Sequence, residues 1–170
     1  MAQLASGVRV ARRVAASTSE AIDVMGPSIQ FLTPLEEEDD TPCLMRGTIP
    51  PGVALPLHSH ADSETFLQIS GEVEAEGGFD WVRIRAGDVF YAPGGAKHAF
   101  RNQRQELAVM ILVSTCRMGR FFREISVPAA SAAGGLSGEM IRHFLQTSER
   151  YGYWNATPEE NERVGISLPM

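Results

Sequence analysis

Three histidines and one glutamate occur in the sequence in a pattern that suits metal binding. His58 and His60 are two residues apart, Glu64 follows His60 by four residues, and His98 comes later in the chain. Imidazole nitrogens and a carboxylate oxygen are ligands that Fe, Mn, Ni, Cu and Zn accept as divalent ions. His143, the remaining histidine, is far from this group in sequence and is expected at the surface. We therefore predict one divalent transition metal ion bound by His58, His60, Glu64 and His98.

The elements that position these four side chains are predicted to be β-strands. Residues i and i+2 of a strand point to one face of a sheet, so His58 and His60 face the same side. Residues 61–63 form a short turn, and Glu64 opens the next strand, so the hairpin brings its carboxylate back beside the imidazoles. His98 comes from a separate strand. Three histidines that converge with a glutamate inside an apolar core would be costly without a cation, and a six-coordinate ion would keep two positions open.

The middle of the chain consists of short strand-like runs separated by glycine and proline turns. Many short strands of this kind are typical of an all-β sandwich or barrel. The predicted strands are residues 29–33, 43–49, 53–57, 64–70, 81–84, 89–92, 98–101 and 107–114. The turns between them include Pro50-Pro51-Gly52, Gly71, Gly87-Asp88 and Pro93-Gly94-Gly95.

Two stretches of the sequence resemble the paired signature motifs of the cupin superfamily. The first motif contains Gly52, His58, His60, Glu64 and Gly71. The second contains Gly87, Pro93, Gly95, His98 and Asn102. The chain is therefore similar to small single-domain cupins with a type 2 conserved barrel, over about residues 45–115. The resemblance implies an all-β fold, the cupin double-stranded β-helix or jelly-roll barrel, with the four metal ligands named above.

Alternation along the strands predicts which other side chains lie near the metal. Phe66 and Gln68 share the face of Glu64, and Phe100 shares the face of His98. Phe66, Gln68 and Phe100 are therefore expected to line the cavity. Gln68 either orients a ligand or a metal-bound water, or is a core amide satisfied within the protein. A mostly apolar cavity favours a small organic ligand, with aromatic compounds among the candidates.

The chain is expected to have three parts. Residues 1–20 form an N-terminal arm, residues 21–116 the cupin barrel, and residues 117–170 a C-terminal helical extension. The arm carries three arginines before Glu20, its first acidic residue, and is either an edge strand, which we favour, or a targeting segment. In the extension, helical spacing predicts one helix with an apolar face and a capping box that starts another. The face consists of Met140, Ile141, Phe144 and Leu145, and the box of Thr157-Pro158-Glu159-Glu160.

Composition limits the partners and the compartment of the protein. The 170 residues carry a formal net charge of -6, which repels a phosphate backbone, so no nucleic-acid partner is expected. No apolar run is long enough to cross a membrane, so no membrane association is expected either. Cys43 and Cys116 show no disulfide pattern and are expected to be buried free thiols of a cytoplasmic protein.

The resemblance leaves the function open between three classes. The complete ligand set favours a metal-dependent oxidoreductase of the dioxygenase type that acts on a small organic, in particular aromatic, substrate. The helical extension also resembles that of small bacterial cupins described as quercetin-dioxygenase-like. One alternative is a non-catalytic module that binds a metal or a small molecule, because no acid or base is evident apart from the ligands. The other is a sugar isomerase or epimerase, which would need a separate base in the cavity.

The sequence also predicts a homodimer. A barrel of this kind leaves open strand edges, which invite pairing. Residues 8–15 alternate weakly in polarity, and docking on a neighbouring subunit is the simplest way for them to be ordered, with docking on their own barrel as the alternative. Light scattering should therefore give twice the chain mass of 18.5 kDa. A monomeric full chain would contradict the dimer, whereas a dimer that persists in a chain starting at Ser19 would exclude the arm as its cause.

Overall fold

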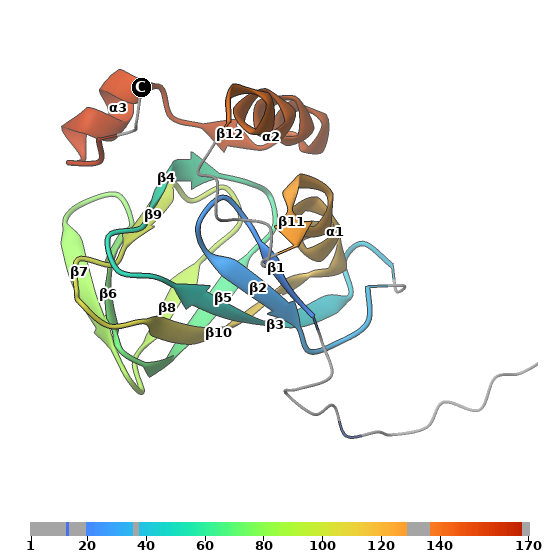
Figure 1. Ribbon diagram of the computed structural model, residues 1–170, viewed down its shortest axis with the longest axis horizontal. Helices are drawn as coiled ribbons and strands as arrows, with labels where there is room; N and C mark the ends of the chain where they lie inside the picture. The colour runs from blue at the N-terminus through green and yellow to red at the C-terminus, as the bar shows by residue number, and fades with distance from the viewer. Residues whose placement is uncertain (1–12, 14–19, 36–37, 129–136, 168–170) are drawn as a thin grey trace, which may run out of the picture.

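The computed structural model of the protein describes Arg13 and residues 20–35, 38–128 and 137–167. The strands form two antiparallel sheets that face each other (Figure 1). One sheet has seven strands in the order β11-β1-β2-β3-β10-β5-β8, and the other has five in the order β12-β4-β9-β6-β7. The predicted all-β barrel with a short helical C-terminal part is therefore confirmed.

Twelve strands and three helices make up the described part of the chain. The strands are β1 (Ala21–Asp23), β2 (Ser28–Phe31), β3 (Pro42–Ile49), β4 (Ala54–Ser59), β5 (Glu64–Ser70), β6 (Glu72–Glu76), β7 (Trp81–Arg85), β8 (Val89–Ala92), β9 (His98–Arg101), β10 (Ala108–Thr115), β11 (Val127–Pro128) and β12 (Trp154–Asn155). The helices are α1 (Cys116–Ile125), α2 (Gly138–Tyr151) and α3 (Pro158–Arg163). No helix among the described residues has both the length and the apolar run needed to cross a membrane.

Strand β6 is the main element that the sequence prediction missed. Its side chains alternate, with Val73 and Ala75 buried between the sheets. Glu74 lies between them on the other face, where it accepts a hydrogen bond from Arg101 Nε at 2.7 Å. Glutamate is rare in strands, so the alternation of polar and apolar residues was the signal that could have identified β6.

The core lies between the two sheets and includes an aromatic cluster beside the histidines. Phe66 of β5 and Phe100 of β9 come from opposite sheets, and their ring centroids are 4.6 Å apart. Phe90 of β8 packs against Phe100 at 5.3 Å. Cys43 and Cys116 are buried and free, as predicted. The aromatic contacts therefore join the sheets at the level where β5 and β9 begin.

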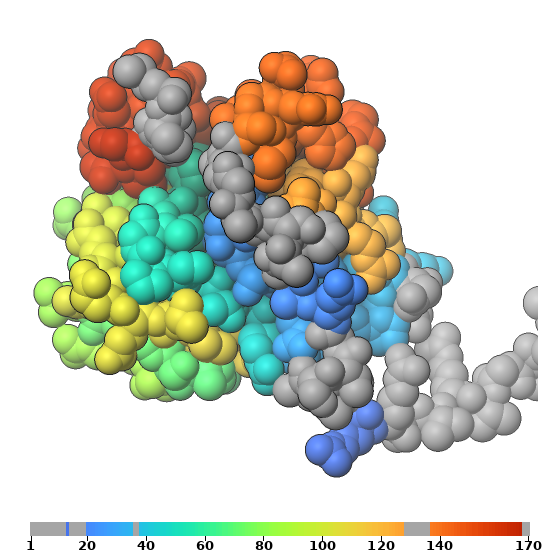
Figure 2. Space-filling model, in the orientation of Figure 1, coloured from blue at the N-terminus to red at the C-terminus, as the bar shows by residue number. Residues whose placement is uncertain are grey.

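The C-terminal segment adds a strand to each sheet as well as helices. Strand β11 pairs with β1, and β12 pairs with β4, where Asn155 lies opposite His58. Helix α1 lies beside β1 and β11, and α2 lies above the end of the barrel near β4 (Figure 1). In the space-filling view α2 and α3 sit over this end of the barrel (Figure 2). The chain thus returns from its helices to the strand that carries His58.

The predicted apolar face of α2 is only partly buried. Phe144 packs against Phe121 of α1, with ring centroids 6.2 Å apart. Ile141 and Leu145, however, are 37% and 49% exposed, and the buried residues of the helix are Thr147 and Ser148. The prediction was wrong for Ile141 and Leu145, because α2 rests on the molecule mainly through its C-terminal half, from which the chain turns into β12.

Helix α3 is held on the barrel by one buried amide. Asn161 is fully buried, and its Oδ1 accepts a hydrogen bond from the backbone N–H of Leu57 in β4 at 2.8 Å. Its Nδ2 donates to the carbonyls of Ala156 and Thr157. The predicted capping box at Thr157 is present and begins this helix. Because every polar group of Asn161 is paired, this contact fixes the end of the chain against β4.

Two loops carry the predicted signature motifs and touch each other through their backbones. Gly95 has a φ of +83° and donates its N–H to the carbonyl of His60 at 2.7 Å. A Cβ on the preceding Gly94 would lie 2.2 Å from the carbonyl oxygen of Ala61. The loop before His98 therefore sits directly against the turn after His60, which leaves no room for a side chain on Gly94.

Most of the predicted N-terminal arm, residues 1–20, lies outside the described residues, which here include Arg13 and Glu20. Whether the arm is an edge strand or a targeting segment, and whether it supports a homodimer, therefore stay predictions.

Replacing Gly94 with alanine should destabilise the protein, because the new methyl group meets a backbone oxygen that can move only with its loop. Overpacking of this kind costs about 1–3 kcal/mol. Thermal and denaturant unfolding of Gly94→Ala would measure the loss. Gly138→Ala is the matched control, because that position starts α2 and its nearest neighbour is an Arg142 side-chain nitrogen at 3.7 Å. It should be neutral or slightly stabilising, and an equally stable Gly94→Ala would contradict the close approach of the loops.

Candidate metal centre

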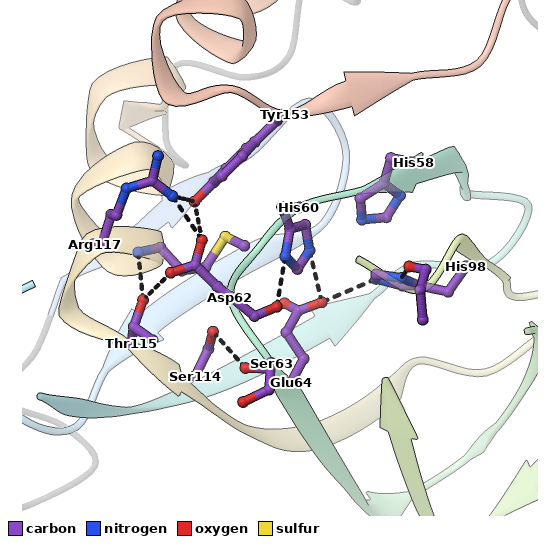
Figure 3. Close-up of polar contacts among 12 residues, drawn as sticks. His58, His60, Asp62, Ser63, Glu64, His98, Ser114, Thr115, Arg117 and Tyr153 are labelled. Carbon is purple, nitrogen blue, oxygen red and sulfur yellow. Dashed lines mark hydrogen bonds and ion pairs between the residues drawn. The ribbon is translucent and has the colours of Figure 1, made fainter. Parts of the chain in front are cut away.

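The four predicted ligands come together at one end of the barrel. His58 lies in β4, His60 follows that strand, and Glu64 and His98 begin β5 and β9. One donor atom from each residue lies within 4.8 Å of the donor atoms of the other three. His58 and His98 are opposite one another in the β4–β9 pair, with ring centroids 4.3 Å apart. His60, Glu64 and His98 are buried and His58 is partly exposed, and Figure 3 shows their side chains grouped together.

Backbone contacts fix the orientation of each imidazole. In all three histidines Nδ1 lies at hydrogen-bond distance from the carbonyl oxygen of a residue two positions away in the chain. The acceptors are Pro56 for His58 at 2.7 Å, Asp62 for His60 at 2.8 Å, and Ala96 for His98 at 2.9 Å. A carbonyl oxygen only accepts, so each Nδ1 carries a proton and each neutral ring keeps its lone pair on Nε2. This second layer of contacts turns three nitrogen lone pairs toward one point.

The carboxylate of Glu64 occupies the same point. Its Oε2 lies 2.9 Å from Nε2 of His98 and 3.1 Å from Nε2 of His60. If both rings are neutral, lone pairs on the nitrogens face lone pairs on the oxygen in a buried site. Nε2 of His60 is buried and has no hydrogen bond of acceptable geometry among the described residues. Such a cluster needs positive charge at its centre, supplied either by extra protons or by a metal ion. The residues therefore fit a divalent ion.

Burial and mutual contacts decide which of these groups is charged without a metal. Desolvation, together with the nearby charge of His98, lowers the pKa of His58 from 6.5 to about 3. Burial would raise the pKa of Glu64, but its close contacts with His60 and His98 outweigh burial and lower the pKa to about 2. Burial opposes charge on His60 as well, yet its contact with Glu64 raises the pKa of His60 above the usual value. The metal-free centre thus combines a carboxylate with a proton on His60, while His58 is neutral.

A polar network outside the histidines connects the centre to the C-terminal segment. The carboxylate of Asp62 accepts hydrogen bonds from Tyr153 Oη at 2.7 Å and Arg117 Nη1 at 2.9 Å, and one from Thr115 Oγ1 (Figure 3). The Tyr153 ring lies 5.1 Å from the ring of His60. Burial and the hydrogen bond to Asp62 raise the pKa of Tyr153. Because the carbonyl of Asp62 also holds His60, this network ties the imidazole to the segment after α2.

The sequence analysis did not identify this network. Asp62 stands between two predicted ligands and was assigned only to a turn. Tyr153 and Arg117 are far from it in sequence, and no pattern in the chain links them. An aspartate in the turn between ligands was the one available signal, because a buried carboxylate needs partners.

A cavity of about 200 Å³ opens on the metal centre between the barrel and the helices. His58, His60 and Glu64 form part of its wall. The apolar part of the wall includes Leu55 of β4, Met118, Phe121 and Phe122 of α1, and Phe144 of α2. Ser148, Tyr153 and Asn155 contribute polar groups. The wall is thus largely apolar, and the C-terminal segment supplies most of the side that faces the histidines.

The predicted pocket residues lie on the other side of the centre. Phe66 and Phe100 line a smaller cavity of about 90 Å³ inside the barrel, which also reaches Glu64 and His98. Gln68 is buried, donates from Nε2 to the carbonyl of Ser70 at 2.8 Å, and lines neither cavity. Its Oε1 has no hydrogen-bond partner among the described residues. Phe66 and Phe100 thus line a cavity beside the ligands, whereas Gln68 does not, and the larger cavity lies between the barrel and the helices.

Comparison with known proteins is consistent with this architecture. The Cupin domain family model matches residues 45–114, the segment that contains all four candidate ligands. No curated protein matches the chain.

Several solved structures share the fold. A polyketide cyclase, RemF, from Streptomyces resistomycificus is 16% identical with a TM-score of 0.56, over 63% of this chain and 80% of that one. A sugar phosphate isomerase of the cupin superfamily from Silicibacter pomeroyi is 19% identical with a TM-score of 0.54, over 61% and 75%. A Cupin 2 conserved barrel domain protein from Salinispora arenicola is 20% identical with a TM-score of 0.51, over 81% and 98%. Residues 45–114, which contain both signature motifs, therefore form a cupin domain, and the two antiparallel sheets agree with the fold of these solved structures.

Proposed function

We propose that this protein binds one divalent transition metal ion through His58, His60, Glu64 and His98, and that it is a metal-dependent oxidoreductase of the dioxygenase type. The observation that carries the proposal is the convergence of one donor atom from each of the three histidines and from Glu64, all within 4.8 Å of one another. The Nδ1 atoms of the histidines are already committed to backbone carbonyls. A bound ion would supply a Lewis-acidic and redox-active centre next to the cavity.

The protein itself positions the reactants and excludes water. The backbone carbonyls hold the rings, and Asp62 keeps the turn after His60 attached to the C-terminal segment. The apolar wall from α1 and α2 lowers the local dielectric constant and limits water at the centre. His58, His60 and Glu64 line the cavity, so a bound substrate would contact the centre from this side.

The cavity favours an apolar or aromatic substrate over a sugar. Each hydroxyl of a sugar needs a hydrogen-bond partner when it is buried, and the wall offers few polar side chains. The fold does not decide the matter, because the solved structures that share it include a polyketide cyclase and a sugar phosphate isomerase. The chemistry of the wall is therefore the better guide.

A non-catalytic binding module is the second candidate. It is favoured by the lack of an evident base on the described cavity wall apart from the candidate ligands. Tyr153 does not fill this role, because its hydroxyl donates to Asp62 and its pKa is raised. A dioxygenase needs no such base if the metal activates its reactants. The dioxygenase and the binding module would therefore bind the same metal and ligand, and only the dioxygenase would convert the ligand to product.

Metal content and oxygen uptake distinguish the dioxygenase from the non-catalytic binding module. Protein purified without added metal should contain close to one transition metal ion per chain. Oxygen uptake should then be measured with a panel of small phenols and catechols. Iron, manganese, nickel or copper with substrate-dependent uptake supports the dioxygenase. Zinc without uptake on any phenol would leave metal binding intact and favour the binding module.

Removing one ligand should abolish stable metal binding without unfolding the protein. His58→Ala is the best choice, because His58 is partly exposed and its ring makes one hydrogen bond, to the carbonyl of Pro56. We expect metal affinity to fall at least tenfold, since lesser changes around metal ligands already cost about 10- to 100-fold. His143→Ala is the matched control, because its ring is exposed and contacts the carbonyl of Glu124. Elemental analysis after dialysis measures both, and equal metal content in the two variants would contradict the assignment.

Metal affinity should rise with pH through the neutral range. The raised pKa of His60 means that its protonated form dominates below that pKa, and this proton must leave when a metal binds. The apparent affinity should therefore rise about tenfold per pH unit while His60 is protonated and level off above its pKa. His58, with a pKa of about 3, adds no dependence near neutrality. Chelator competition between about pH 5 and 8, with proton release measured in buffers of different ionisation enthalpy, tests this expectation. An affinity independent of pH would refute the proton on His60.

A further inference from the structure

One aspartate connects the imidazole of His60 to the C-terminal segment through both its backbone and its side chain. The carbonyl oxygen of Asp62 lies 2.8 Å from Nδ1 of His60 and accepts its proton. The carboxylate of Asp62 is buried and accepts a hydrogen bond from Tyr153 Oη at 2.7 Å (Figure 3). Only a few bonds separate the carbonyl from the carboxylate of one residue. A contact that fixes the carboxylate therefore also restricts the direction of the carbonyl.

Tyr153 contacts His60 in a second way, and its own position is fixed outside the ligand loops. The rings of Tyr153 and His60 have centroids 5.1 Å apart. On its other contacts, the tyrosine ring packs against Phe121 of α1 at 4.7 Å. Tyr153 also stands directly before β12, which pairs with β4, the strand of His58. Packing against α1 and pairing of β12 thus hold the tyrosine where its hydroxyl meets Asp62.

The carboxylate of Asp62 keeps other partners if this hydroxyl is removed. Arg117 Nη1 donates to it at 2.9 Å, and Thr115 Oγ1 donates to its other oxygen. A cation and a hydroxyl therefore remain to compensate the buried charge. Because Asp62 stays paired without Tyr153, the contribution of the tyrosine hydroxyl is the direction in which it holds the carboxylate.

We propose that Tyr153 is a positioning residue of the metal centre: its hydroxyl acts through Asp62 on the orientation of the His60 imidazole, and so on the affinity and coordination geometry of a bound ion. This inference rests on the proposed metal binding for its consequence, whereas the chain of contacts belongs to the metal-free protein. A residue outside the segment 45–114 that matches the Cupin domain family thus controls a candidate ligand inside it.

Tyr153→Phe removes the hydroxyl and keeps the ring that packs against His60. Tyr151→Phe is the matched control, because the ring of Tyr151 lies 5.6 Å from that of Tyr153 while its hydroxyl pairs with Glu124 and not with Asp62. Cobalt(II) is the probe, because it binds nitrogen and oxygen ligands and its visible absorption reports coordination geometry. Chelator competition gives the cobalt affinity of each protein, and the spectrum at saturation gives the geometry of the site.

We expect Tyr153→Phe to weaken cobalt binding about fivefold, the value of one net hydrogen bond, and to change the visible bands of the bound ion. Tyr151→Phe should equal the wild type in both measurements. Denaturant unfolding of the metal-free proteins serves as the comparison. A merely structural hydroxyl would lower the stability of Tyr153→Phe without changing the cobalt spectrum, and this result would overturn the inference.

Asp62→Ala tests whether the effect passes through the aspartate, because it removes the acceptor of the tyrosine hydroxyl. In this background Tyr153→Phe should cause no further loss of cobalt affinity, so the two losses are not additive. Additive losses would show that Tyr153 acts by another route and would contradict the proposal. If Asp62→Ala does not fold, the comparison of Tyr153→Phe with Tyr151→Phe decides alone, and a cobalt affinity of Tyr153→Phe within twofold of the wild type refutes the positioning role.

A wild-type protein that binds no cobalt would refute the proposed function, and the metal-free protein then tests the inference. Nitrogen-15 NMR detects the ring Nδ1–H of His60, whose exchange with solvent is slow while the carbonyl of Asp62 holds it. This exchange should be faster in Tyr153→Phe and unchanged in Tyr151→Phe. Equal exchange in all three proteins would show that Tyr153 does not position His60.

Discussion

One carboxylate oxygen organises the metal centre, because two imidazoles share it while their other nitrogens are fixed elsewhere. Oε2 of Glu64 lies near Nε2 of both His60 and His98. Backbone carbonyls hold the Nδ1 atoms, so neither ring can turn a proton toward the carboxylate without becoming charged. The fold thus supplies a buried site that is stable only with added positive charge. This need for positive charge lowers the pKa of Glu64 and raises the pKa of His60.

Close backbone contact between the two ligand loops makes this arrangement possible. The N–H of Gly95 meets the carbonyl of His60, and the absence of a side chain on Gly94 lets the loops touch. On the opposite side, the carboxylate of Asp62 receives Tyr153 and Arg117 from the C-terminal segment. His60 is therefore held from two directions by contacts that depend on distant parts of the chain. The geometry of the centre therefore depends on how the C-terminal segment packs against the barrel.

The barrel and the convergence of His58, His60, Glu64 and His98 could be predicted, because strand alternation and turn spacing are local properties of the sequence. The larger cavity could not be predicted from the sequence. Its apolar wall comes from α1 and α2, and where a helix rests on a barrel depends on tertiary contacts. The misassigned face of α2 illustrates this point. Ile141 has the spacing of a core residue but is exposed, whereas Ser148 is buried because that end of the helix leads into β12. A local sequence pattern shows that a helix is amphipathic, but it does not show which part of the fold packs against that helix.

The interior of the barrel offers little separate space for a substrate. Phe66 and Phe100 pack at 4.6 Å below the ligands, and the cavity beside them measures about 90 Å³. This cavity adjoins the larger one, because Leu55, His58, Glu64 and Phe122 line both. Because β12 pairs with the strand of His58, any shift of the C-terminal segment moves the cavity wall and a ligand strand together. The barrel thus supplies the four candidate ligands, and the residues that follow it supply the helical part of the cavity wall beside them.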